Sequence, residues 1–451
     1  DEQFLLGFDA KARPVDGWSL DAAYRWLSYD TRVDQWTPVA STLKQADPSD
    51  PKSWTVQRSQ SRSRTERFGH AFDGNVQWET GSDKSWRNVA TVGVNGRWSG
   101  TDRSASATGR AHSAVNVYTG KVSEALRDSN LVPVPSYLTE SVAWNLYAMD
   151  QLSLFGNRLI LSGGLAWAGE SLDRDYGPTG IRKDTVKNLS KILADKSGGP
   201  IPTAGALFQV APALAVYGSY ATSYSLAAGD AEDRSGRTGE FDPSTGVNLE
   251  AGLKYDMDKA SAAISVFHVS QKGVLVQSAA TDLNSNGNRY YTQSDDEGRE
   301  SFGVEMEVSA NPARGWTTSL VGAWIDAQVK SSVDAVADGS PVDKTPEWSA
   351  TLHNRYAFAG GALDGLGASM TVNWQTERWM STRSTAAPDP IVMPWTTKVD
   401  LGLSYRITPE LELAANLENV FDETIVESGT TGSSLVMGSP RNLVLRMGYS
   451  F

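Results

Sequence analysis

Cysteine is absent from the 451-residue chain, and histidine occurs only four times. Disulfide bonds and thiolate metal sites are therefore excluded. There is no basic surplus either, because 41 lysines and arginines stand against 53 acidic residues, and the formal charge of −12 argues against a nucleic-acid partner. No stretch approaches the roughly eighteen apolar residues that a membrane-spanning helix needs. A helical membrane protein is excluded, although 40% of the residues are hydrophobic.

Motifs that carry enzymatic chemistry are missing too. We find no nucleophile elbow, no phosphate-binding glycine-rich loop and no serine in a recognisable catalytic setting. The segment Asp282-Leu283-Asn284-Ser285-Asn286-Gly287 begins like an EF-hand calcium loop, but Gln293 occupies the position that requires a bidentate glutamate, so we interpret it as an Asx-rich hairpin loop. The histidines lie in different segments without metal-ligand spacing: His70, His112, His268 and His353. We expect no enzyme, no metal site and no resident cofactor.

What the chain does contain is a repeated two-residue alternation of apolar and polar side chains. In one segment an apolar row alternates with small or charged residues: Leu249, Ala251, Leu253, Tyr255 and Met257. The segments 302–308 and 399–405 show the same pattern. Each therefore predicts a β-strand with one apolar face. A single strand of this kind is also compatible with a half-buried sheet in a soluble sandwich.

The number and rhythm of these segments favour a membrane barrel over a sandwich. Roughly seventeen segments occur, most of them about nine to fifteen residues long, enough for a tilted strand to cross a bilayer. Short turns alternate with long polar loops, which we place at about 31–64, 101–136, 170–200, 226–244, 278–298, 331–345, 380–393 and 423–438. This asymmetry is typical of outer-membrane barrels. We therefore predict an all-β, transmembrane antiparallel β-barrel.

Aromatic residues and the end of the chain support this prediction. Many of the 15 tryptophans lie near predicted strand ends, where amphipathic rings favour the membrane–water boundary. The last segment carries a strict apolar row that finishes at the terminal aromatic residue: Leu443, Leu445, Met447, Tyr449 and Phe451. It resembles the C-terminal strand by which outer-membrane barrels reach the barrel assembly machinery. We expect that machinery, outer-membrane lipid and lipopolysaccharide as partners.

Several separate blocks resemble the TonB-dependent receptors, within them the siderophore-receptor branch. They cover approximately residues 137–451 in the family's order and spacing, whereas 1–136 fit by strand rhythm alone. The blocks are the segment 241–255, with its Pro and Gly leading into a strand that carries Glu, Gly and Lys; Arg299-Glu300-Ser301-Phe302-Gly303-Val304-Glu305-Met306-Glu307; the turn Gly315-Trp316; Leu146-Tyr147-Ala148-Met149-Asp150-Gln151-Leu152; Thr345-Pro346-Glu347-Trp348; and Asn416-Leu417-Glu418-Asn419-Val420-Phe421-Asp422.

This resemblance implies a receptor in the bacterial outer membrane that imports ferric siderophores by TonB-dependent gating. The family has a barrel of about 22 strands with a plugged lumen. We therefore expect residues 1–451 to be its β-barrel domain, with the segment 4–13 as roughly the sixth strand and with the plug, the TonB box and the first strands outside this sequence. The TonB–ExbB–ExbD complex would act through that plug, and the ligand would be an Fe(III)–siderophore.

The ligand must approach from the long-loop side, so we expect its site there. In the predicted strand 368–379, the apolar row through Trp374 points Gln375 and Trp379 into the lumen. Trp379 at the mouth, with Arg383 just beyond it, suits an aromatic, anionic metal chelate through stacking and charge. Loop position alone adds Tyr176, Arg182, Tyr290 and Tyr291. Solvated loop residues or interfacial aromatics are the simpler interpretation of each residue taken singly.

Two functional alternatives stay open. The same architecture serves import of another solute, such as cobalamin, haem or an oligosaccharide, and a passive porin-like channel would share the barrel. Iron-repressed transcription beside siderophore genes would favour iron. The arginine-rich segment 58–64 suggests either polyanion binding or a loop that faces lipopolysaccharide or solvent, and we favour the second.

Overall fold

The computed structural model describes residues 2–38, 44–47, 49–105, 112–116, 134–176, 192–225, 231–238, 241–278, 282–293, 298–330, 338–380, 391–431 and 434–450. Within these ranges the structure is built from β-strands and two single-turn 3₁₀ helices, η2 (Pro51–Ser53) and η3 (Gly361–Leu363). None of the helices in the described ranges has the length and apolar composition needed to cross a membrane. The predicted all-β class is confirmed.

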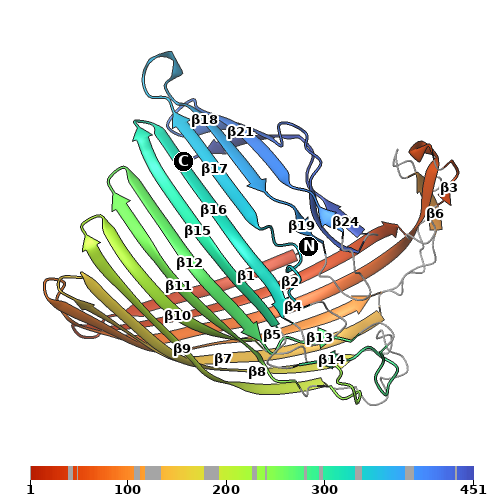
Figure 1. The fold of residues 1–451 in the computed structure, drawn as a ribbon, viewed down its shortest axis with the longest axis horizontal. Helices are drawn as coiled ribbons and strands as arrows, with labels where there is room; N and C mark the ends of the chain where they lie inside the picture. The colour runs from red at the N-terminus through yellow and green to blue at the C-terminus, as the bar shows by residue number, and fades with distance from the viewer. Residues whose placement is uncertain are drawn as a thin grey trace.

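One antiparallel wall dominates the fold and appears in Figure 1 as a single strongly curved sheet. Apart from the short strands β3 (Lys44–Gln45) and β6 (His112–Asn116), seventeen described strands make up this wall, which confirms the predicted number. They are β1 (Glu2–Ala12), β2 (Trp18–Pro38), β4 (Trp54–Gly81), β5 (Trp86–Ala105), β7 (Val134–Leu154), β8 (Leu159–Tyr176), β9 (Ile192–Ala211), β10 (Leu214–Ser225), β11 (Ser244–Met257), β12 (Ala260–Lys272), β15 (Gly298–Ala313), β16 (Trp316–Lys330), β17 (Trp348–Ala357), β18 (Leu366–Gln375), β21 (Thr396–Arg406), β22 (Leu411–Glu418) and β25 (Asn442–Tyr449).

Each wall strand pairs with the next one along the chain, from the pair β1–β2 to the pair β22–β25. In the part of the chain that the structure describes, β1 and β25 each have a partner on one side only. Three short hairpins lie between wall strands: β13 (Val276–Gln277) with β14 (Tyr291–Thr292), β19 (Arg378–Trp379) with β20 (Val392–Met393), and β23 (Val426–Thr431) with β24 (Ser434–Met437). All three belong to long connections.

The connections alternate between short turns and long segments, as predicted. The short turns depend on glycine where the backbone requires it. Gly315, between β15 and β16, has a φ of 82°, and a Cβ placed on it would lie 2.2 Å from the main-chain oxygen of Ala357 on β17. Only a residue without a side chain fits this turn without strain.

The predicted limits of the long loops are wrong in several places, most clearly at 31–64. Residues 31–38 continue β2, and 54–64 already belong to β4, so the arginine-rich segment is strand and not loop. Cross-strand ion pairs hold the extension, with Arg64 2.9 Å from Asp30 and Arg62 3.1 Å from Asp34. Polar residues on both faces hide such a strand from a search for apolar rows.

The two faces of the wall differ as the alternation predicts. On β11, Leu249, Leu253 and Met257 lie exposed in one row, whereas Glu250 and Lys254 point to the other face. The apolar rows form the outer, lipid-facing surface. Aromatic residues bound it at two heights, because on three strands such residues lie eight positions apart, about 26 Å along the strand: Trp18 and Trp26, Trp316 and Trp324, Trp348 and Tyr356. These pairs define a lower girdle near the short turns and an upper girdle near the long connections.

Candidate ligand-binding site

The inner face of the wall is polar and hydrogen-bonded across strands. On β10 and β11, the hydroxyl of Tyr217 donates to the carboxylate of Glu250, and the ammonium of Lys254 lies 4.9 Å from the centre of the Tyr217 ring. Glu305 and Glu307 on β15 occupy the same face by alternation with the apolar row of that strand. The interior therefore offers charged and hydrogen-bonding groups to whatever enters it.

A pocket of about 510 Å³ lies where β4, β5, β7 and β8 run side by side, and its lining includes the exposed rings of Phe72 and Trp144. Arg97 on β5 and Glu170 on β8 form an ion pair across its floor, with 3.3 Å between Nη2 and Oε1. The register explains the contact, since both residues pair with Ala143 on the intervening strand β7. Tyr224, from the long-connection end of β10, adds an aromatic ring to the lining.

The polar lining of this pocket is incompletely satisfied. The Oδ1 atom of Asn145 is buried, and no hydrogen-bond donor reaches it within the described part of the protein. Arg97 precedes the girdle residue Trp98, and Asn145 follows Trp144, so alternation turns the tryptophans outward and the polar residues inward. Arg97, Asn145 and Glu170 therefore point to the lumen at the height of the upper girdle, whereas Trp144, in the same lining, points to the lipid side.

Sequence reasoning missed this pocket. Arg97, Asn145 and Glu170 are far apart in the chain, and each is an ordinary polar member of an alternating strand. The register of β5, β7 and β8 brings them together, and register depends on turn lengths and bulges such as the one between Trp167 and Gly169. The only signal in the sequence was a cation directly before Trp98 and an anion three residues after Trp167.

The predicted strand 368–379 is shorter than expected, which removes one argument for Trp379. β18 ends at Gln375, and Trp379 belongs to the separate hairpin β19–β20. The N–H of Thr376 donates to the oxygen of Trp348 on β17, and the paired register of β18 ends just before it, at Gln375. Alternation counted from Trp374 therefore holds for Gln375, whose side chain donates to Thr396 at 3.0 Å, but it does not carry to Trp379. Arg383 lies outside the described residues.

Tyr290 and Tyr291 lie in a different structure, formed by the two long connections before β11 and β15. Glu232, 2% exposed, accepts a hydrogen bond from Asn284 at 2.7 Å, and its main-chain oxygen accepts the N–H of Tyr291. Tyr290 is 5% exposed and donates its hydroxyl to Asp282 at 2.6 Å. This hydrogen bond, together with burial, raises the pKa of Tyr290. As placed, Tyr290 holds this pair of connections together, and Tyr291 is half-buried beside it.

Two further residues of the predicted site remain, Tyr176 and Arg182. The main chain of Tyr176 ends β8, opposite Tyr137, and Arg182 lies outside the described residues. The structure therefore brings Tyr290 and Tyr291 together, and it places Gln375 at the end of β18 and Trp379 in the connection between β18 and β21.

The segment that begins like a calcium loop is an Asx-rich hairpin, as predicted. The side-chain oxygen of Asn284 accepts the N–H groups of Asn286 and Asn288 at 2.9 and 3.0 Å, and Leu283 pairs with Arg289 across the turn. Over the described ranges, no group of three or more histidine, cysteine, aspartate or glutamate residues is arranged to hold a metal ion.

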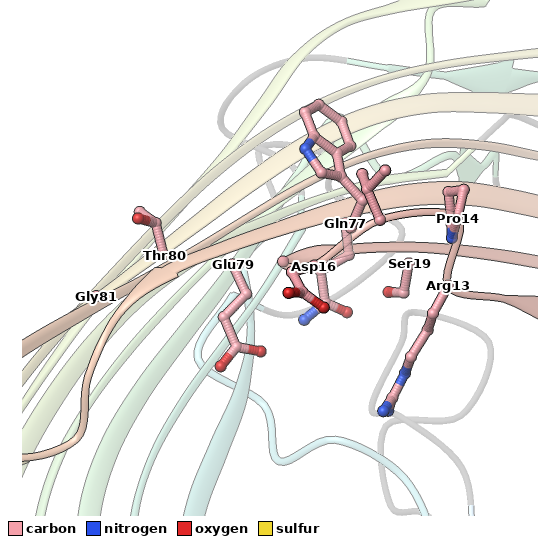
Figure 2. A pocket seen from close by; sticks show the side chains of 11 residues that line it. Arg13, Pro14, Asp16, Ser19, Gln77, Glu79, Thr80 and Gly81 are labelled. Carbon is pink, nitrogen blue, oxygen red and sulfur yellow. The ribbon is translucent and has the colours of Figure 1, made fainter.

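A second hollow, of about 600 Å³, lies at the opposite, short-turn end. It is formed by the turn between β1 and β2 together with the end of β4, and Figure 2 shows the side chains of Arg13, Asp16 and Glu79 reaching the same side of it. Arg87 on β5 pairs with Glu79 at 2.7 Å. Because this hollow lies away from the long connections, it is a poorer candidate for first contact with an external ligand.

Comparisons with known proteins agree with this architecture. A family model described as "TonB dependent receptor-like, beta-barrel" matches residues 1–420, including the first 136 residues that resembled the family by strand rhythm alone. The metal-pseudopaline receptor CntO of Pseudomonas aeruginosa (strain UCBPP-PA14) is 27% identical over 278 residues, which are 61% of this chain and 36% of that protein. The ferripyoverdine receptor of P. aeruginosa PAO1 is 25% identical over 284 residues, 61% of this chain and 32% of that one.

Solved structures show the same fold. The crystal structure of the ferric-catecholate import receptor Fiu from Escherichia coli K12, in its closed form, matches 100% of this chain and 64% of that chain with a TM-score of 0.79 and 20% identity. The matched part of this chain spans about a third of the length of the curated relatives.

Proposed function

Since the chain belongs to the TonB-dependent receptor family and forms its β-barrel in the bacterial outer membrane, we propose that it serves the import of ferric siderophores. The chain is not an enzyme. Its relatives are named as receptors for metal-pseudopaline, ferripyoverdine and catecholate siderophores, all of them metal chelates or their ligands. We extend that ligand class to this chain, with TonB-dependent gating as the means of import.

The observation that carries the proposal is the polar lumen face of the wall at the height of the upper girdle. There Arg97 and Glu170 form an ion pair, and Asn145 lies beside them on the neighbouring strand. Catecholate and hydroxamate chelates offer flat faces, negative charge and hydrogen-bonding groups, which these side chains complement.

Uptake of radiolabelled iron tests the proposal. The full-length receptor is expressed in a host without its own siderophore receptors, and ferric catecholate, hydroxamate and carboxylate chelates are supplied in turn. We expect saturable uptake of at least one chelate, lost in a strain without TonB. Arg97→Gln should weaken that uptake at an unchanged receptor level, whereas the matched variant Arg158→Gln, near the short turns, should not.

Two results would contradict the proposal. Uptake that persists without TonB would indicate a passive porin-like channel. Failure with every iron chelate, accompanied by TonB-dependent uptake of cobalamin, haem or an oligosaccharide, would assign the barrel to another solute.

A further inference from the structure

Three cationic side chains gather at the short-turn end of the wall, where β12, β15, β16 and β17 meet their turns. Lys259 lies directly before β12, Arg314 lies in the turn between β15 and β16, and Arg355 lies near the end of β17. All three line a pocket of about 450 Å³, together with Asn311 and Thr317. Among the described residues that form this lining there is no aspartate or glutamate, although acidic residues outnumber lysine and arginine in the chain by 53 to 41.

The register of the strands places these residues in one row. The main-chain oxygen of Lys259 accepts the N–H of Asn311 at 2.8 Å, and the hydroxyl of Thr317 donates to the side-chain oxygen of Asn311 at 3.1 Å. Thr317 lies opposite Arg355 in the pairing of β16 with β17. The main chains of Lys259 and Arg355 are therefore three strand spacings of about 4.8 Å apart, about 14 Å in all.

The pocket lies at the rim of the wall and not on one face alone. Arg355 points to the lumen, because its neighbour Tyr356 belongs to the lipid-facing row, whereas Trp316, in the same lining, points to the lipid side. Arg314 is held at this rim by Gly315, whose positive φ lets the turn approach the main chain of β17. The rim faces the periplasm, since the short turns of outer-membrane barrels lie on that side.

In the described part of the protein, none of the three cations takes part in an ion pair. All three side chains are exposed, and Asp258, next to Lys259 in the turn, does not belong to the lining. The hollow beside β1 and β2 differs, because there Arg87 pairs with Glu79 at 2.7 Å. Like charges that converge without an acid repel one another, and an anion between them removes this repulsion and accepts charge-assisted hydrogen bonds.

We propose that this rim is a docking site for an extended acidic segment of a periplasmic protein, with carboxylates at alternate positions. Side chains on one face of an extended chain repeat about every 6.6 Å, so three alternate carboxylates span about 13 Å. That span matches the row from Lys259 to Arg355, and Arg314 lies between the two in strand order. A small anion would occupy only part of the row. This inference concerns a partner and does not depend on which solute the barrel imports.

Binding of a synthetic peptide to the purified full-length receptor tests the proposal. The probe is a fluorescently labelled peptide with three glutamates at alternate positions, and its anisotropy is followed at low ionic strength, where charge screening is weak. We expect saturable binding to the wild type. The triple substitution Lys259→Gln, Arg314→Gln and Arg355→Gln should weaken this binding at least tenfold, because it removes every cation of the row.

Three cations of other short turns supply the matched control: Arg13, Lys84 and Arg158. Their joint replacement by glutamine removes the same charge from the same end of the barrel, and it should change the affinity for the peptide by less than twofold. The side chains replaced in both variants are exposed, so circular dichroism and heat-modifiable migration should show both folded like the wild type. Equal weakening by the two triple substitutions would reduce the effect to net charge and overturn the proposal.

The composition of the peptide separates a docking site from a general anion site. A peptide with glutamines in place of the glutamates should not bind, and a peptide with its three glutamates in succession should bind more weakly than the alternating one. Equal affinity for the alternating and the consecutive peptide would make the rim a small-anion site and overturn the docking of an extended segment. The proposal is also refuted if the wild type binds no peptide or if binding survives the substitution of Lys259, Arg314 and Arg355.

Discussion

Replacing Leu253 by arginine should damage the barrel, whereas replacing its neighbour Lys254 by glutamine should not. Leu253 lies four residues above Met257, the last residue of β11, about 13 Å along the strand and about 9 Å in height for a strand tilted by roughly 45°. An apolar band about 25 Å tall then has Leu253 close to its midplane. Its cross-strand neighbours are Val216 and Ile264, so the surrounding surface is apolar as well.

An arginine near the midplane costs about 2–4 kcal/mol on a lipid-facing strand. Since about 1.4 kcal/mol is a factor of ten, the ratio of folded to unfolded barrel should fall by roughly 30-fold to several hundred-fold. Urea unfolding of the full-length receptor in lipid vesicles measures this, and Leu253→Ala controls for the loss of the leucine side chain. Lys254→Gln should change the unfolding free energy by less than about 0.5 kcal/mol, because Lys254 faces the lumen. Equal losses for Leu253→Arg and Lys254→Gln would refute the assignment of faces.

Three further predictions test the turn, the loops and the mouth. Gly315→Ala should lower the unfolding free energy by about 1–3 kcal/mol, because its backbone has a positive φ and the new Cβ would meet a main-chain oxygen. In the control variant Gly448→Ala the new Cβ meets nothing within 4 Å, so its unfolding free energy should stay unchanged, and equal urea midpoints for the two variants would contradict the prediction. Burial tends to raise the pKa of Asp233, but hydrogen bonds from Arg237 outweigh burial and lower that pKa below its usual value. The contact therefore contributes its full stabilisation above about pH 5, and this stabilisation is lost as the pH falls through the lowered pKa. Hydrogen exchange at 231–238 should therefore accelerate in acid in the wild type and be independent of pH in Asp233→Asn, after correction for intrinsic exchange; identical pH profiles would be the contrary result. Trp379→Ala together with Arg383→Ala should lower iron uptake per surface receptor, whereas girdle residues would lower receptor level instead.

The wall could be predicted from the sequence because each strand carries its own evidence. The alternation around Leu253 and the tryptophans eight positions apart identify strands, faces and membrane limits from local sequence alone. Where the strands extend above the membrane, that evidence disappears. Residues 58–64 carry polar side chains on both faces, so Arg62 and Arg64 look like loop residues although they lie on β4.

The pocket beside β5, β7 and β8 could not be predicted for a different reason. Its charged pair, Arg97 and Glu170, depends on the register of three strands separated by connections of unequal length. A slip by one residue would turn one member of the pair to the lipid side. Local patterns decide which face a residue occupies, but they contain no information on which residue of a neighbouring strand lies beside it.

The connection after β18 shows why alternation along a strand could not place the side chains beyond the end of that strand. The alternation through Trp374 led to Trp379 as the inward aromatic and to Arg383 as its cation. Because β18 ends at Gln375, the alternation does not extend into β19, where Arg378 is buried together with Met393 of β20. Alternation therefore assigns faces only as far as a strand runs, and side chains in the connection beyond it have to be placed by the geometry of that connection.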